Sequence, residues 1–182
     1  ETLIYEGPTE PRGAGGLTNT FTYKNFTFSF LLSFKYDYKI RLNDAFFGTY
    51  SDTDALPGDL VNRWAVPGDE NITNIPVILD QGVAQVSSDA VLAYDLYNKS
   101  SVRVANGDYV RLKTARLSYQ LPSGWARRAG LSHANLSVEG QNLALLYADR
   151  ATLKGQDPEF FSSGGVALPQ TRIITVSLNI GL

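Results

Sequence analysis

A run of alternating side chains, NFTFSFLLSFKYDYKI (Asn25 to Ile40), constrains the fold of this chain more than any other feature. From Phe26 onward every second residue is large and apolar or aromatic, and the residues between them are polar except Leu31. Because successive side chains of a β-strand point to opposite faces, the run predicts one strand over residues 26–40 with a continuous apolar face. That face packs in a protein core or contacts lipid, and the alternation alone leaves both readings open.

Four further segments have the same period of two and are predicted as strands. The first, at about 16–24, is joined to the long strand through a tight turn at Lys24 and Asn25. The others are predicted at about 109–121, 133–143 and 171–182. The sequence therefore indicates an all-β chain with antiparallel strands.

The connections between these strands alternate between short and long. The long ones are about 41–108 and 149–170, and the other two are a tight turn and the segment PSGWARRAGLS. In an antiparallel meander alternate connections lie at opposite ends of the sheet. Short turns on one side and long loops on the other are typical of outer-membrane barrels, in which the loops are extracellular and the C-terminus of this chain would be periplasmic.

Five strands do not close such a barrel, because bacterial single-chain barrels have an even number of strands, at least about eight. Two open edges in lipid would leave unpaired backbone groups at high cost. The chain also begins with Glu1 rather than Met. We therefore expect it to be the C-terminal part of a longer chain.

Composition argues against several functional classes. The net charge of −2 does not provide the basic surface that nucleic-acid binding requires. Cysteine is absent and His133 is the only histidine, so a thiolate nucleophile and a multi-histidine metal site are excluded. Four loop aspartates lack the spacing of a calcium-binding loop: Asp52, Asp54, Asp59 and Asp69. We expect no cofactor, no metal site and no enzymatic activity.

The alternation assigns side chains to two predicted surfaces. The lipid-facing set is Phe26, Phe28, Phe30, Leu32, Phe34, Leu117, Tyr119, Leu136, Val138, Ile174, Val176, Leu178 and Ile180. The lumen-facing set is Lys35, Asp37, Arg116, Gln120, Glu139 and Gln141. Three tyrosines suit aromatic girdles at the membrane interfaces, or ordinary cross-strand pairs: Tyr36, Tyr38 and Tyr119.

Aromatic residues in the long segment 41–108 are candidates for contact with a ligand or a covering protein. They are Phe46, Phe47, Tyr50 and Trp64. The alternative is that they pack within the loop. A short helix at about Leu60 to Trp64 is also expected in this segment.

Six phrases of the sequence resemble, in the same order, the C-terminal segments of the SusC/RagA family of TonB-dependent outer-membrane transporters of Bacteroidetes. They are GGLTNTFTYKNFTFSFLLSFKYDYKI, NRWAVPGDENITNIP, GDYVRLKTARLSYQLPSGWARRAGL, LSVEGQNLALLY, KGQDPEF and PQTRIITVSLNIGL. The resemblance covers almost the whole chain. It implies that residues 1–182 are the last five strands of a 22-stranded plugged barrel, with the plug domain and TonB box outside this sequence. Leu182 departs from the aromatic residue that commonly ends such barrels.

The resemblance also implies a function and a set of partners. The function is import of glycans or peptides across the cell outer membrane. The partners are the remainder of the barrel and its plug, a SusD-like surface lipoprotein, TonB, and membrane lipid or lipopolysaccharide, with no nucleic acid. Two other readings stay open: a soluble β-sandwich that binds carbohydrate or acts as an adhesin, and a passive outer-membrane porin.

Overall fold

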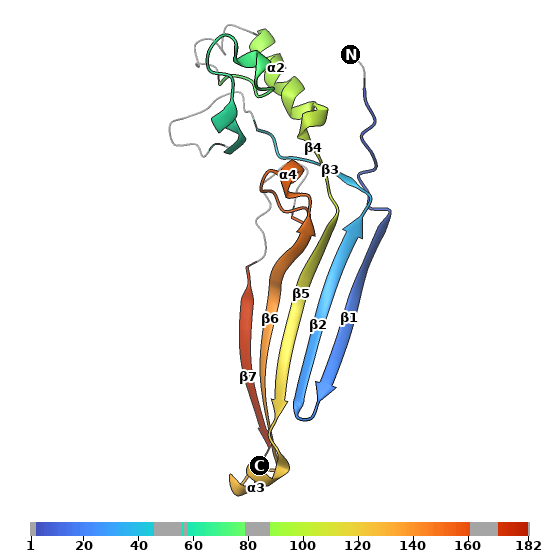
Figure 1. Cartoon of the computed structure of the whole chain (residues 1–182), viewed down its shortest axis with the longest axis vertical. Coiled ribbons are helices and arrows are strands. Elements are labelled where there is room, and N and C mark those ends of the chain that lie inside the picture. Colours follow the sequence, from blue (N-terminus) through green and yellow to red (C-terminus); the bar gives the residue numbers. More distant parts are fainter. Residues whose placement is uncertain (1–2, 46–55, 57, 79–87, 161–170, 182) are drawn as a thin grey trace. The chain divides into compact units, whose positions relative to one another are not determined.

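The computed structural model describes residues 3–45, 56, 58–78, 88–160 and 171–181 (Figure 1). The chain divides into two compact units. The sheet unit comprises residues 8–38, 107–149 and 168–182, and the loop unit comprises residues 1–7, 39–106 and 150–167. The long connections of the chain therefore form a folded unit of their own.

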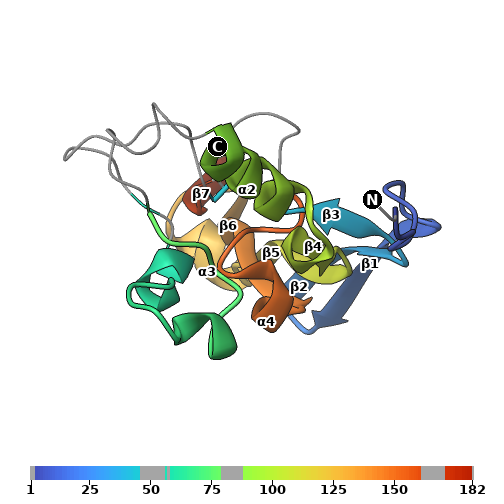
Figure 2. The same cartoon turned by 90° about the horizontal axis from the view of Figure 1, so that it is seen from above.

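The sheet unit is built on a five-stranded antiparallel sheet. Its strands, in spatial order, are β1 (Gly13–Tyr23), β2 (Phe26–Tyr36), β5 (Tyr109–Gln120), β6 (His133–Ala148) and β7 (Ile173–Gly181). Figure 2, which looks from above, shows the same order from β7 to β1. Each of the five segments expected as strands overlaps one of these strands, and consecutive strands of this sheet are neighbours in it.

The single strand predicted over 26–40 is wrong beyond Tyr36. β2 ends at Tyr36, and Asp37 has a φ of +59°, a left-handed conformation that interrupts an extended strand. The Asp37 N–H donates to Oδ1 of Asp108 at 2.7 Å instead of to a neighbouring strand. The alternation of side-chain type continues through this break, so the sequence pattern does not reveal it.

After the break the chain enters a second, two-stranded sheet. β3 (Lys39–Arg41) pairs with β4 (Val104–Asn106) in the loop unit. Each strand has only three residues. This sheet is too small to cover one face of a five-stranded sheet.

β6 is longer than the predicted segment 133–143, because the strand continues after its alternation changes phase. Asn142 has a φ of +51°, and the register with β5 shifts between Leu112 and Thr114 and again between Val110 and Arg111. Each shift is a β-bulge, which puts extra residues on one strand and exchanges the faces of the side chains that follow. The strand therefore continues to Ala148 although its simple period of two ends near residue 142.

The loop unit packs around a small core. Its helical elements are η1 (Gly58–Asn62), η2 (Asp69–Asn71), α2 (Ser88–Lys99), η3 (Ser101–Arg103) and α4 (Arg150–Leu153). Ala45, Leu60, Tyr94 and Tyr97 form a buried cluster, against which Ile75 and Ile78 pack. The helix expected at Leu60 to Trp64 is the single 3-10 turn η1, which begins two residues earlier.

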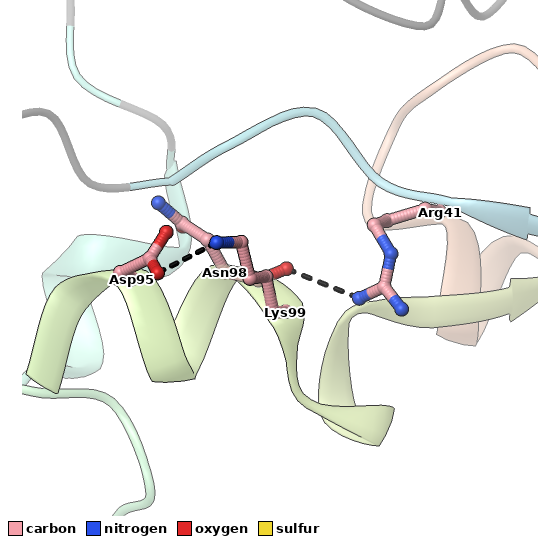
Figure 3. A network of polar contacts seen from close by, with 4 residues as sticks. All are labelled: Arg41, Asp95, Asn98 and Lys99. Atoms are coloured by element: carbon pink, nitrogen blue, oxygen red, sulfur yellow. Dashed lines mark hydrogen bonds and ion pairs between the residues drawn. The ribbon is translucent and has the colours of Figure 1, made fainter. Parts of the chain in front are cut away.

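Polar contacts fasten the end of α2 (Figure 3). Arg41 donates from one Nη atom to the carbonyl oxygens of Asn98 and Ser100, both at 3.2 Å. A cation at a helix C-terminus satisfies carbonyls that have no partner within the helix and interacts favourably with the helix dipole. Asn98 is 7% exposed, and its Oδ1 accepts a hydrogen bond from the N–H of Ala45 at 3.0 Å. The end of α2 and the chain after β3 are thus bonded together.

We expect Asn98→Ala to loosen the loop unit by about 1–3 kcal/mol, because it removes a buried hydrogen-bond acceptor. Lys99→Ala is the matched control, since its ion pair with Asp95, at 2.6 Å, joins half-exposed or more exposed side chains and pairs of this kind contribute only about 0.3–0.5 kcal/mol. Hydrogen exchange of α2 amides in the full-length protein would measure both effects. Equal exchange rates in the two variants would contradict the role given to Asn98.

Candidate functional surfaces

The register of the sheet divides its side chains between two faces. Residues directly opposite each other in antiparallel strands lie on the same face. One row across the sheet, for example, consists of Phe21, Phe28, Leu117, Val138 and Val176. We call the face that carries this row the apolar face, and the opposite one the polar face.

Every residue of the predicted lipid-facing set lies on the apolar face, from Phe26 on β2 to Ile180 on β7. The register adds residues that the prediction left out of that set: Leu17, Phe21 and Tyr23 on β1, and Val110 and Leu112 on β5. The apolar face therefore extends across all five strands.

The apolar face is open in this chain. Ile174 is 72% exposed at one side of the sheet and Phe28, near the other, is 40% exposed. A contiguous apolar surface of this size is unusual on a soluble monomer and marks a contact with another protein or with a membrane. A β-sandwich would require a second sheet over this face, and the described residues contain no second sheet beyond the short β3–β4 pair.

Aromatic side chains lie at both ends of the apolar face. Phe26 and Tyr119 pair at one end with ring centroids 4.6 Å apart, and Tyr36 lies at the other end, 53% exposed. From Phe26 to Tyr36 the strand extends about 33 Å, or about 25 Å along the membrane normal at the usual strand tilt of about 40°. This matches the apolar band of outer-membrane barrels, which is about 25 Å tall.

Tyr38 does not belong to such a girdle. It is 3% exposed, and its ring lies so close to Gly107 that a Cβ at that position would come within 2.5 Å of it. The left-handed turn at Asp37 changes the direction in which the following residues project. The expectation for Tyr38 is therefore wrong.

The polar face carries five of the six predicted lumen-facing residues: Lys35, Arg116, Gln120, Glu139 and Gln141. Three of them are linked, since Gln141 Nε2 donates to Glu139 Oε1 at 3.0 Å and Arg116 lies 3.9 Å from the same carboxylate. Asp37 lies beyond the end of β2, where it forms an exposed ion pair with Arg12 at 3.1 Å. It is therefore not part of the polar face.

Arg111 is a member of the polar face that the sequence prediction missed. It is 4% exposed and donates to the side-chain oxygen of Asn142 at 3.1 Å. The bulge at Lys113 places Arg111 on the same face as Arg116, whereas a strict period of two would place Arg111 on the apolar face. An interruption of the alternation beside two basic residues was the only signal in the sequence.

The described part of the chain holds neither a metal-binding cluster nor a helix that could span a membrane. Among the described residues no three His, Cys, Asp or Glu side chains approach closely enough to hold a metal ion. No helix in the described ranges is long and apolar enough to cross a membrane. His133 is exposed at the start of β6, with its Nδ1 3.2 Å from Ser132 Oγ.

Trp64 is the one predicted ligand-contacting aromatic residue whose position the structure describes. Phe46, Phe47 and Tyr50 lie outside the described residues. Trp64 is half-buried, its Nε1 donates to the carbonyl of Val66, and its backbone N–H donates to Ile75 at 2.9 Å. These contacts favour packing within the loop over direct contact with a ligand.

The turn after Trp64 is organised by a carboxylate. Asp69 Oδ2 accepts hydrogen bonds from the N–H groups of Ala65 and Val66, each at 3.0 Å. The bonds from Val66 and Ala65 lower the pKa of Asp69 below its usual value of 3.8 because they stabilise the charged form. Gly68 has a φ of +108°, which only glycine adopts without strain.

Comparisons with known proteins agree with this geometry. No protein-family model matches the chain. Two relatives from Formosa agariphila match it: TonB-dependent receptor P26, 27% identical over 91% of this chain, and TonB-dependent receptor P3, 28% identical over 84%. The matches cover 16% and 13% of those proteins, so the chain spans less than a fifth of their length.

Solved structures of the RagAB peptide importer share the fold. The open-open state matches 98% of this chain with a TM-score of 0.65 and 17% identity, and the closed-closed state matches 97% with a TM-score of 0.66 and 19% identity. Each match covers 18% of the other chain. These matches support the resemblance of the chain to part of a SusC/RagA-type TonB-dependent transporter. The expected fold class, a partial antiparallel barrel, is confirmed, and the relatives are receptors and importers rather than enzymes.

We expect Asp69→Asn to loosen the turn after Trp64, because a neutral amide accepts weaker hydrogen bonds from Ala65 and Val66 than a carboxylate does. In the parent protein the depressed pKa means that Asp69 stabilises the turn above the usual carboxyl range, and this contribution is lost as the pH falls through the lowered pKa. Faster hydrogen exchange of residues 65 and 66 at neutral pH would show the effect. Asp95→Asn, in a different element, should leave these amides unchanged.

Proposed function

We propose that this chain is a stretch of the wall of an outer-membrane importer that takes up nutrients with energy supplied through TonB. The single observation that carries the proposal is the apolar face, which crosses all five strands with Asn19 as a polar exception and has aromatic residues at both ends. In this reading it contacts the acyl chains of membrane lipid or lipopolysaccharide. The chain then crosses the membrane several times as strands.

The open edges of the sheet support the idea that other strands complete the barrel. β1 and β7 are the outermost strands, and within the described residues neither has a ladder on its outer side. In lipid each unpaired backbone group costs several kcal/mol, so spanning sheets close on themselves. We infer that strands from the remainder of the transporter pair with both edges.

The polar face suits the inside of a plugged barrel. The Arg116, Glu139 and Gln141 contacts keep charged groups paired with one another on that face. In the proposed assembly they form the wall that faces the plug. Their role is to support the barrel wall rather than to perform chemistry.

The orientation of the chain across the membrane is proposed from the connections at the two ends of the sheet. The β1–β2 turn and the β5–β6 connection lie at one end of the sheet (Figure 1), and Ser132 of that connection donates to the carbonyl of Gly181 at 2.9 Å. We propose that this end, with the C-terminus, is periplasmic. The connections of the loop unit then leave the strands on the extracellular side, where a SusD-like surface lipoprotein would cover the transporter.

The cargo is proposed from the relatives alone. The RagAB structures are those of a peptide importer, and glycans are the second class that the sequence resemblance implies. This chain forms wall and loops in either case. A passive porin remains the competing function, because the plug and TonB box that define active transport lie outside this sequence.

Substitutions on adjacent residues of β7 test the lipid contact. Ile174 lies on the apolar face at the level of Phe30, and Thr175 lies on the polar face opposite Glu139. In the full-length transporter we expect Ile174→Lys to reduce stability by about 2–4 kcal/mol, because a cation near the membrane midplane is poorly solvated. Thr175→Lys should be tolerated. Heat-induced unfolding in detergent or lipid would measure both, and equal stability of the two variants would contradict the assignment of faces.

Uptake measurements separate active import from passive diffusion. We expect cells that express the full-length transporter to accumulate labelled oligopeptides or oligosaccharides only when TonB is present. Barrel levels in the outer membrane, measured by immunoblot, provide the control for expression. Uptake that is equal with and without TonB would favour the porin.

A further inference from the structure

The helix α3 (Ser123–Arg128) joins β5 to β6 at the short-turn end of the sheet (Figure 1). Its sequence, SGWARR, places one tryptophan and two arginines within one and a half turns. Trp125 is 66% exposed, and Arg127 and Arg128 are exposed in the last turn. An exposed tryptophan beside two cations suits contact with a surface that is apolar on one side and wet on the other.

The segment that contains α3 is held by a buried side chain and by hydrogen bonds around the helix. Ala126 is 0% exposed, its N–H donates to Pro122 at 3.1 Å, and its carbonyl accepts from Leu131 at 2.9 Å. On either side of the helix, Leu121 donates to Ala134 at 2.9 Å, which continues the pairing of β5 with β6. The exposure of Trp125 is therefore a property of an ordered segment and not of a loose end.

The charges of the sheet unit are unevenly distributed along its strands. Residues 109–138 contain no Asp or Glu, and Lys24 in the β1–β2 turn adds a further cation at the short-turn end. Four acidic residues of this unit flank the strands at the opposite end: Glu10, Asp37, Asp108 and Asp149. Glu139 is the only acidic residue within the five strands. The short-turn end therefore offers cations with no acidic neighbours at its level.

The position of α3 beside the apolar face helps to decide whether a protein or a lipid surface contacts this helix. Tyr119, at the end of that face, is four residues before the start of the helix. Tryptophan and tyrosine side chains concentrate where the apolar core of a membrane meets its head groups. A stable protein interface needs about 800 Å² from each partner, more than one tryptophan and two arginines supply. A lipid surface needs only such local contacts.

We propose that α3 anchors the barrel in the periplasmic leaflet by binding anionic phospholipid head groups. Trp125 lies at the level of the head groups, and Arg127 and Arg128 bind their phosphates. The inference rests on the proposed function, since it requires the apolar face to contact lipid. It goes further in assigning a lipid class and a leaflet to one short connection.

Site-directed fluorescence in the full-length transporter tests the anchor. The chain has no cysteine, so Trp125→Cys, on a background in which any other cysteines are replaced, takes a single bimane label. The protein is placed in nanodiscs whose phosphatidylglycerol or phosphatidylethanolamine carries a nitroxide near the head group. We expect the label to be quenched more strongly by the phosphatidylglycerol quencher.

Removal of the two arginines should abolish this preference. In Trp125→Cys with Arg127→Gln and Arg128→Gln, we expect the enrichment of phosphatidylglycerol around the label to fall about fivefold or more. Trp125→Cys with Arg150→Gln and Arg172→Gln loses the same charge outside α3, and its preference should be unchanged.

Labels at Leu178→Cys and Ser177→Cys show whether the barrel itself is in the membrane. Quenching of the Leu178 label by acyl-chain nitroxides, without quenching of the Ser177 label, supports the proposed function. If the Leu178 label is not quenched, the proposed function fails. If it is quenched while the label at 125 is not, the anchor alone is overturned, and α3 extends into the periplasm. Equal quenching at 125 by both head groups, insensitive to the arginines, overturns the selectivity for anionic lipid.

Discussion

The hydrogen-bonded ladder of the five-stranded sheet is the constraint on which the remaining features depend. It pairs β1, β2, β5, β6 and β7 in a register that places apolar residues opposite apolar ones across the sheet. Because direct partners share a face, one strand with a clear alternation fixes the orientation of its neighbours. A shift of one residue in any pair would send the apolar side chains of that strand to the polar face. The continuous apolar surface and the paired charges behind it are thus two consequences of the same register.

The positions at which the ladder is interrupted decide where β2 ends and which side chains lie on the polar face. The left-handed residue Asp37 ends β2 and releases the chain into the loop unit, where β3 pairs with β4. The bulges between β5 and β6 bring Arg111 into contact with Asn142 on the polar face. Bulges of this kind leave one strand with an extra residue and change the side chains that face inward. These bulges change which side chains lie on the polar face, while the part of the sheet beyond Thr114 keeps its regular alternation.

The loop unit shows that a long connection can have a defined fold without regular strands. Its order comes from a small buried cluster around Tyr94 and Tyr97 and from contacts that are distant in sequence, such as those of Arg41 and Asn98. Local pattern gives little information about such contacts, because the two partners are separated by more than fifty residues. The helix expected at Leu60 to Trp64 is instead a 3-10 helix of the same length that begins two residues earlier and includes the buried Leu60.

The sequence by itself determined the strands, their antiparallel order and the composition of the apolar face, because a period of two is a direct consequence of strand geometry. The predicted lipid-facing residues, from Phe26 to Ile180, therefore all lie on one face of the observed sheet. Tertiary structure alone decided where strands end and where the alternation changes phase, as at Asp37, Lys113 and Asn142. Backbone conformation at these positions depends on partners far along the chain, such as Asp108 for Asp37. The burial of Tyr38 beside Gly107 and the contact of Arg111 with Asn142 follow from such distant contacts, which no local pattern of residue types records.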